Sequence, residues 1–175
     1  MRILIFSIVL LSTLPIFAQT AGQIAVIDAQ KVVQNSEMGK KALAEVKALK
    51  DKKQQDIDQR QNSIQTMQDK LEKQKDILSA EAREKLTSDI SKGITELRRF
   101  REDSENEIQA RLNSAIKVIE EKVLPIIQKL GNERGYAMII SRDQLIYYSA
   151  KNDITEEVIR LFNSSATAPA QTQGK

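Results

Sequence analysis

Histidine, cysteine and tryptophan are absent from this chain, and its 175 residues include only 3 prolines and 6 glycines. Without histidine and cysteine the chain cannot form Ser-His-Asp or Cys-His nucleophilic sites, zinc sites built on those ligands, or disulfides. Carboxylates are abundant, but none lies in a segment that would form a pocket. We therefore expect no catalytic residue, no metal site and no cofactor, and interpret the protein as something other than an enzyme.

A large excess of one charge is also lacking. Lys and Arg number 27 against 24 Asp and Glu, which gives a formal charge of +3 and a pI near 9.0. The chain is mildly basic rather than polycationic, and it has no aromatic-basic platform or recognition-helix motif. Non-specific nucleic-acid binding therefore stays a weak alternative function, and no specific nucleic acid is expected as a partner.

Only one long apolar run occurs, and it lies at the start of the chain. After Arg2 it extends from Ile3 to Leu14, and Ala18 offers a small residue for cleavage before Gln19. This pattern predicts a secretory signal peptide over residues 1–18. A membrane anchor is the alternative, but the run is shorter than the ~20 apolar residues that span a bilayer. We expect export to a bacterial periplasm.

The middle of the chain is unusually polar. From Lys50 to Asp76 there is no glycine or proline, and the only apolar residues are Ile57, Ile64, Met67 and Leu71. Ile57, Ile64, Leu71 and Leu78 recur every seven residues, which is the spacing of a thin coiled-coil seam. A helix with so few apolar residues cannot serve a compact core, so we expect it to project from the body as an arm.

Two serines mark where the long helices begin. Ser36 offers an N-cap for a helix from about Glu37 to Leu78, and Ser79 offers a second cap at the expected break between the helices. The second helix then extends from about Ala80 to Leu130. Its expected seam contains Ile90, Ile94, Leu97, Ile108 and Leu112.

Two helices of similar length that connect short strands should fold back as an antiparallel hairpin. We place this arm at residues 37–125, with its tip near 79–82. Residues that meet across it should have numbers that sum to about 161. Examples are Ile64 with Leu97 and Leu71 with Ile90.

The remaining segments, 19–36 and 126–162, are predicted to form a small body. The run from Gln23 to Ile27 is typical of a strand, and Tyr136–Ile140 with Leu145–Tyr148 suggests a β-hairpin. Asp153 begins a capping-box pattern that opens a final helix. Residues 163–175 carry no apolar periodicity and are predicted to be a disordered tail. The expected fold class is α+β, predominantly α.

Such a small body cannot bury enough apolar surface to support a long arm alone, and the chain has no cysteine or histidine for staples. We therefore expect the body to associate with other copies of itself. The candidate residues for this association are the apolar and aromatic side chains of the predicted strands: Ile24, Val26, Met138, Ile140, Ile146 and Tyr148.

Taken together, several segments resemble the Skp/OmpH family of periplasmic chaperones. They are Gln23-Ile24-Ala25-Val26-Ile27-Asp28, Lys31-Val32-Val33-Gln34-Asn35-Ser36, Leu78-Ser79-Ala80-Glu81-Ala82-Arg83, Leu124-Pro125-Ile126-Ile127, Gly135-Tyr136-Ala137-Met138-Ile139-Ile140 and Asp153-Ile154-Thr155-Glu156-Glu157-Val158-Ile159. No single segment is specific, but their order and spacing are. The resemblance implies a homotrimer whose helical arms enclose a cavity. Unfolded outer-membrane proteins would be held there, without ATP, on their way to the outer membrane.

Most seam residues should simply hold the two helices together. The better candidates for contact with an unfolded client are Met67 and Phe100, together with five basic residues: Lys70, Lys73, Lys75, Arg98 and Arg99. From Lys40 to Arg99 there are fifteen Lys/Arg and eleven Asp/Glu, so the basic excess is small. Through these bases the membrane surface or lipopolysaccharide is a further expected partner.

A periplasmic coiled-coil adaptor or scaffold is the main alternative function. Such proteins carry a larger β domain beside the arm, whereas this sequence offers only short strands. Suppression of client aggregation without nucleotide would separate the two readings.

Overall fold

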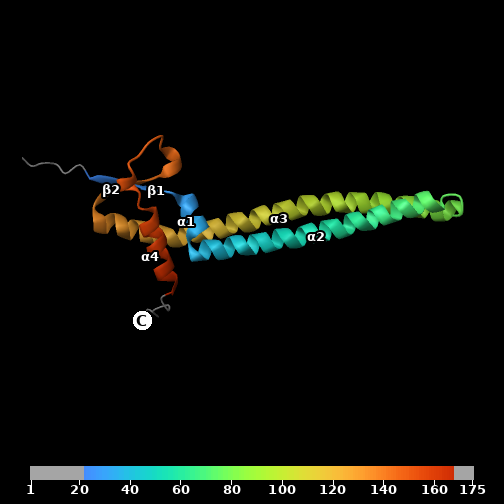
Figure 1. Cartoon of the computed structure of the whole chain (residues 1–175), viewed down its shortest axis with the longest axis horizontal. Coiled ribbons are helices and arrows are strands. Elements are labelled where there is room, and N and C mark those ends of the chain that lie inside the picture. The colour runs from blue at the N-terminus through green and yellow to red at the C-terminus, as the bar shows by residue number, and fades with distance from the viewer. Residues whose placement is uncertain (1–21, 168–175) are drawn as a thin grey trace, which may run out of the picture.

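The computed structural model describes residues 22–167 and shows a long helical hairpin that projects from a small body (Figure 1). The expected fold class is confirmed: helices dominate, and a small sheet lies in the body. The predicted signal peptide at residues 1–18 lies outside the described residues, as does the last part of the predicted tail.

The body begins with strand β1 (Gln23–Ile27), followed by the short helix α1 (Ala29–Asn35). Asp28 joins the two, because its Oδ1 accepts a hydrogen bond from the Lys31 amide at 2.9 Å and so caps α1. The second half of β1 is buried, whereas its first two residues are exposed in the single chain.

Strand β2 (Tyr136–Ser141) pairs with β1 in parallel, and the whole helical hairpin forms the connection between them. The predicted β-hairpin is wrong. After β2 the chain forms the 3₁₀ turns η1 (Arg142–Gln144) and η2 (Ala150–Asn152), and residues 145–148 form no strand. The turn lacks the glycine that a tight hairpin needs. The second edge of β1 is already used, because the Ile154 amide donates to the Val26 carbonyl at 2.9 Å.

Helices α2 (Glu37–Gln74) and α3 (Ala80–Arg134) begin at the two predicted caps. Ser36 Oγ accepts from the Gly39 amide at 3.1 Å, and Ser79 Oγ accepts from the Ala82 amide at 3.2 Å. Helix α2 ends four residues before the predicted Leu78, and α3 continues four residues past the predicted Leu130. At the rise of an α-helix, α2 is about 57 Å long.

Helix α3 continues through Pro125 and ends at Gly135, whose φ of 67° places it in the left-handed region. Glycine adopts this conformation without the steric penalty of a Cβ, so it closes the helix and turns the chain into β2.

The two long helices lie side by side and antiparallel, as expected (Figure 1). Arg101 donates to Gln61 at 2.9 Å, and Lys53 lies 2.6 Å from Glu107. The residue numbers of these pairs sum to 162 and 160. The predicted register near 161 is therefore confirmed.

The apolar core lies where the base of α3 meets β1, α1 and the last helix, α4 (Thr155–Thr167). Its buried members are Ala25, Ile27, Val32, Ile119, Val123, Leu130, Ile154, Val158, Ile159 and Phe162. Helix α4 crosses the base of α3 in Figure 1.

The prediction of a disordered tail from residue 163 is wrong for residues 163–167, because α4 extends to Thr167. Asn163 Oδ1 accepts a hydrogen bond from the Glu37 amide at 2.9 Å, so this part of α4 helps satisfy the start of α2. The polar composition of the segment hid this role. The remainder of the predicted tail, residues 168–175, lies outside the described residues.

Candidate functional site

The seam of the arm is a narrow apolar cluster. Ile64, Ile90 and Leu97 are buried, and Ile57, Met67, Leu71 and Leu86 pack against them. Each helix contributes residues mainly from one side, which leaves most of the remaining surface of the arm polar. The seam residues therefore hold the hairpin together, as the sequence predicts for most of them.

Met67 is half-buried and belongs to this seam cluster. It lies beside Gly93, where an added Cβ would be 3.1 Å from Ile64 Cγ1 and 3.8 Å from Met67 Cε. A hollow of about 450 Å³ opens at this point, and its lining includes the apolar Met67 and Ile64 and the charged Arg60 and Asp89. The thioether of Met67 is thus accessible from a groove, as an adaptable contact requires.

Phe100 is half-buried and held by two cations from the opposite helix. The Arg60 guanidinium lies 4.3 Å from the ring centroid, and Lys53 Nζ lies 5.4 Å from it. Lys53 also pairs with Glu107. Cations over an aromatic ring attract it electrostatically. Lys53 and Arg60 lie four residues before the seam residues Ile57 and Ile64, on the same stripe of α2. In mid-arm, the contact of these two cations with Phe100 therefore takes the place of apolar packing between the helices.

The five basic candidates, Lys70, Lys73, Lys75, Arg98 and Arg99, are all exposed. Arg98 pairs with Glu102 on its own helix at 2.8 Å. The other four form no ion pair within the described part of the chain. They do not converge on one pocket, and their positive charge is dispersed along the outer half of the arm.

Four exposed apolar residues of the arm were not selected from the sequence as contact sites. Ile77, at the tip, is 83% exposed, and Ile94, which was placed in the seam, is 49% exposed. Val118 and Leu124, near the base of the arm, are 44% and 54% exposed. Ile94 follows Ile90 by four residues and precedes Leu97 by three, so it lies at the edge of the seam stripe, where the opposite helix does not cover it.

The six candidates for self-association fall into three classes. Ile24, Met138 and Ile146 are exposed, at 42%, 50% and 108%. Ile140 and Tyr148 are half-buried, whereas Val26 is buried within its own chain. The exposed apolar side chains are therefore concentrated on the outer parts of β1, β2 and the loop that follows.

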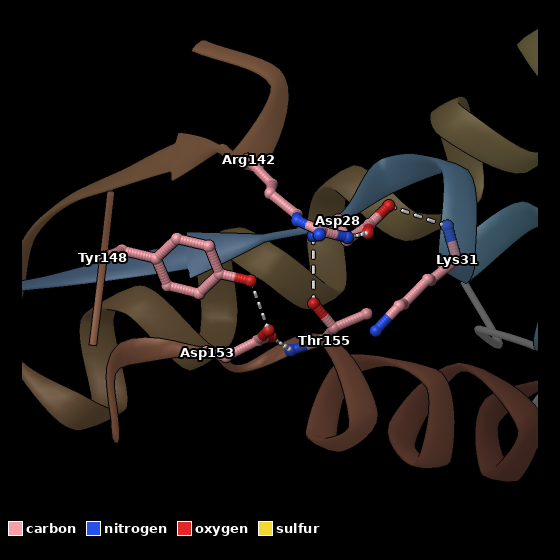
Figure 2. Close-up of polar contacts among 6 residues, drawn as sticks. All are labelled: Asp28, Lys31, Arg142, Tyr148, Asp153 and Thr155. Carbon is pink, nitrogen blue, oxygen red and sulfur yellow. Dashed lines mark hydrogen bonds and ion pairs between the residues drawn. The ribbon is translucent and has the colours of Figure 1, made fainter. Parts of the chain in front are cut away.

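A polar cluster that sequence reasoning missed joins four segments of the body (Figure 2). Arg142 Nη1 donates to Asp28 Oδ2 at 2.6 Å, and the Asp28 amide donates to Thr155 Oγ1 at 2.9 Å. The Tyr148 hydroxyl donates to Asp153 Oδ2 at 3.1 Å. These residues are far apart in the sequence, and no spacing pattern links them.

The cluster keeps both carboxylates ionised. Burial alone would raise the pKa of Asp28, but hydrogen bonds from the Lys31 amide and the Arg142 side chain bring this pKa below its usual value. Burial likewise opposes ionisation of Asp153, and its pKa is nevertheless lowered by hydrogen bonds from Thr155 and Tyr148. Burial and the neighbouring carboxylate raise the pKa of Tyr148, which therefore stays protonated as a donor.

Membrane-spanning helices and metal-binding clusters are both missing from the described residues. No helix within residues 22–167 combines the length and hydrophobicity needed to cross a lipid bilayer. Over the same range, no group of three or more acidic side chains is arranged to hold a metal ion. The hydrogen bonds of the polar cluster hold the end of β1 against Arg142 and the start of α4, and hold Tyr148 against Asp153.

Comparison with known proteins agrees with this architecture. The family model of outer membrane proteins described as OmpH-like matches residues 23–162. An uncharacterized protein of Aquifex aeolicus (strain VF5) is 25% identical over 136 residues, which covers 78% of this chain and 83% of that protein. A Caulobacter crescentus CB15 protein, described as a candidate outer membrane chaperone (OmpH-like), has the same fold with a TM-score of 0.75 at 14% identity. The match covers 82% of this chain and 85% of that one.

Proposed function

Because this chain belongs to the OmpH-like family of outer membrane proteins, we propose that it is a periplasmic holdase chaperone, one that binds unfolded outer-membrane proteins without ATP and prevents their aggregation. The observation that carries the proposal is the arm itself. In the two helices, of 38 and 55 residues, apolar side chains pack in a thin seam between the helices. The long outer surface is mostly polar and carries a few scattered exposed apolar residues. Such a surface suits weak contact with many unfolded chains.

The exposed apolar points are few and separate. Ile77 and Ile94 lie on the surface, and Met67 is accessible beside Gly93. Burial of one such side chain contributes about 1.5–3 kcal/mol at most, so each contact is weak and reversible. Several arms acting on one client would raise the overall affinity without any single strong contact. Release without nucleotide follows from the same weakness.

Self-association is part of the proposal. A sheet of two short strands supports a long arm, and the body exposes Ile24, Met138 and Ile146 to water. Covering these side chains with another copy would stabilise the body, and a homotrimer would place three arms around a shared space. The leader pattern at residues 1–18 supports the periplasm as the place of action.

The deciding experiment measures light scattering while an unfolded outer-membrane β-barrel protein is diluted from urea, with the mature protein present and no nucleotide. We expect aggregation to be suppressed at stoichiometric amounts, and added ATP to make no difference. A matched amount of an unrelated soluble coiled-coil protein serves as the control. Suppression that needs ATP, or no suppression at all, would contradict the proposal.

The adaptor alternative predicts a different result. A coiled-coil scaffold would leave client aggregation unchanged and would bind a folded partner instead. The described body contains one two-stranded sheet, which is less than such adaptors carry. The chaperone proposal is therefore favoured over it.

A further inference from the structure

An apolar groove lies at the root of the arm, where α1 and the end of β1 face α3. Its volume is about 350 Å³, at the low end of the range of about 300–1,000 Å³ for ligand sites. Apolar side chains make up most of its lining: Ile27, Val32, Val33, Ile119, Val123, Leu124 and Ile127. Leu124 is 54% exposed, so apolar surface in this base groove is in contact with water.

The rim of the base groove is acidic. Glu120 and Glu121 lie on α3 beside it, both are exposed, and neither forms an ion pair within the described residues. A groove with an apolar lining and unpaired acidic residues at its edge is complementary to an apolar segment that carries a lysine or an arginine.

The same chain presents such a segment. The loop between Arg142 and Asp153, here called the apolar loop, projects from the body beyond β1 and β2 (Figure 1). Ile146 and Tyr147 at its tip are 108% and 85% exposed. Lys151, in the same loop, is exposed and forms no ion pair within the described range.

The apolar loop is fixed in this position. Arg142 is tied to Asp28 at 2.6 Å, Tyr148 to Asp153 at 3.1 Å, and Asn152 Nδ2 donates to the Ile24 carbonyl at 2.9 Å. With both ends held to β1 and to the start of α4 (Figure 2), the loop does not line the groove of its own chain. Because the loop is held away from the groove of its own chain, the exposed loop residues can contact such a groove only on another copy of the protein.

We propose that Ile146 and Tyr147 of one copy insert into the base groove of the next copy, with Lys151 facing Glu120 and Glu121. This inference rests on the self-association in the proposed function and names its contact. Because loop and groove are different surfaces, the contact is head-to-tail, and it forms the proposed homotrimer when the rotation from one copy to the next closes after three copies. The C-terminal residues 168–175 are a poor alternative occupant, because they include no large apolar side chain.

The absence of cysteine makes a clean cross-linking test possible. Ile146→Cys and Leu124→Cys place one thiol on the loop and one in the groove, both at exposed positions. We expect mild oxidation of the double variant to give covalent multimers up to the ring size, while neither single variant cross-links to itself. As a control, Ile146→Cys is combined with Ile94→Cys, which is similarly exposed but lies on the arm.

The outcomes separate this inference from the proposed function. An associated double variant that forms no cross-link, or a single variant that pairs with itself, overturns the head-to-tail contact and leaves self-association standing. A protein that sediments as a monomer overturns both. Cross-linking in the arm control as strong as in the groove pair also contradicts the inference, because it shows random collision.

A charge exchange tests the rim independently. Lys151→Glu, or Glu120→Lys together with Glu121→Lys, should each weaken association by about twofold to fivefold, the size of an exposed ion pair. Combining all three changes should restore association. If the combined variant associates more weakly than either parent, Lys151 does not face this rim.

Discussion

Arg142 at the end of β2 lies 2.6 Å from Asp28 at the end of β1, although 114 residues separate them in the chain. The pair closes the ends of two parallel strands that the entire arm connects. Asp28 also caps α1 and donates its amide to Thr155, so one residue links the sheet, α1 and α4. The start of the apolar loop is fixed by the same contact.

Removing the arginine should destabilise the body. Arg142→Leu leaves the Asp28 carboxylate, which is 11% exposed, with only the Lys31 amide as a hydrogen-bond partner. We expect a lower urea midpoint, measured by circular dichroism at fixed protein concentration. Arg98→Leu, which breaks an exposed pair with Glu102, is the control and should change the midpoint little. Equal effects of the two variants would contradict a structural role for the Asp28 pair.

Stability should fall in acid because of Asp28 and Asp153. Both pKa values are lowered on folding from the usual 3.8, so the folded state binds protons less readily than the unfolded chain. Their contribution is fully present above about pH 4, and it is lost as the pH falls through the lowered values. Urea midpoints measured from pH 7 to pH 3 should decline mainly below pH 4. In Asp28→Asn the decline should be shallower, and an unchanged slope would argue against this assignment.

Shortening the buried seam should weaken the arm. Ile64→Ala removes a side chain that is 8% exposed and lies between the two helices, at a cost of about 2 to 3 kcal/mol. Hydrogen exchange should quicken in the outer arm while the body stays protected. Ile94→Ala, at a position 49% exposed, should change exchange far less. Faster exchange in the body as well would mean that arm and body unfold as one unit.

The cations over Phe100 should stabilise mid-arm. Phe100→Leu keeps an apolar side chain but loses the attraction of Arg60 and Lys53, which is worth about 0.5–1 kcal/mol for each exposed pair. We expect faster amide exchange near residues 53–60 and 97–104. Client affinity measured on the same variant tells whether Phe100 also contacts clients, since a purely structural role leaves affinity unchanged once the arm is folded.

The bases near the tip should affect the rate of client capture. Changing Lys70, Lys73 and Lys75 to Gln removes three charges that form no ion pairs in the described chain. The association rate with an acidic unfolded client should fall at low salt, because long-range attraction is reduced. At about 1 M salt, where the Debye length is ~3 Å, variant and parent should have equal rates. A difference that persists at high salt would indicate direct contact instead.

The arm was predictable because its signals are local. Heptad spacing of Ile57, Ile64 and Leu71 marks the seam, and Ser36 and Ser79 mark the helix starts. Each of these signals involves residues within one or two helical turns. The antiparallel register then follows from the break at Ser79, since a turn at a known residue leaves one way to fold the second helix on the first.

The body was harder to predict, because a short apolar run indicates a strand but does not indicate which other strand it pairs with. Tyr136–Ser141 pairs with β1 instead of with residues 145–148, since α3 returns the chain beside β1 and Ile154 occupies the other edge of β1. Met67 and Phe100 are both half-buried, and the two cations over the Phe100 ring lie on the opposite helix. Their role depends on the register of the whole hairpin.

The amino-acid sequence by itself determined the long polar helices, their caps and their reversal, because helix formation and capping depend on neighbours a few residues away. Only the tertiary structure decided the parallel strand pair, the cluster around Asp28 and the direction of the apolar loop. These depend on contacts between residues more than a hundred positions apart. In the folded protein, the hairpin formed by the two arm helices lies between these residues in the chain and brings them within reach of one another.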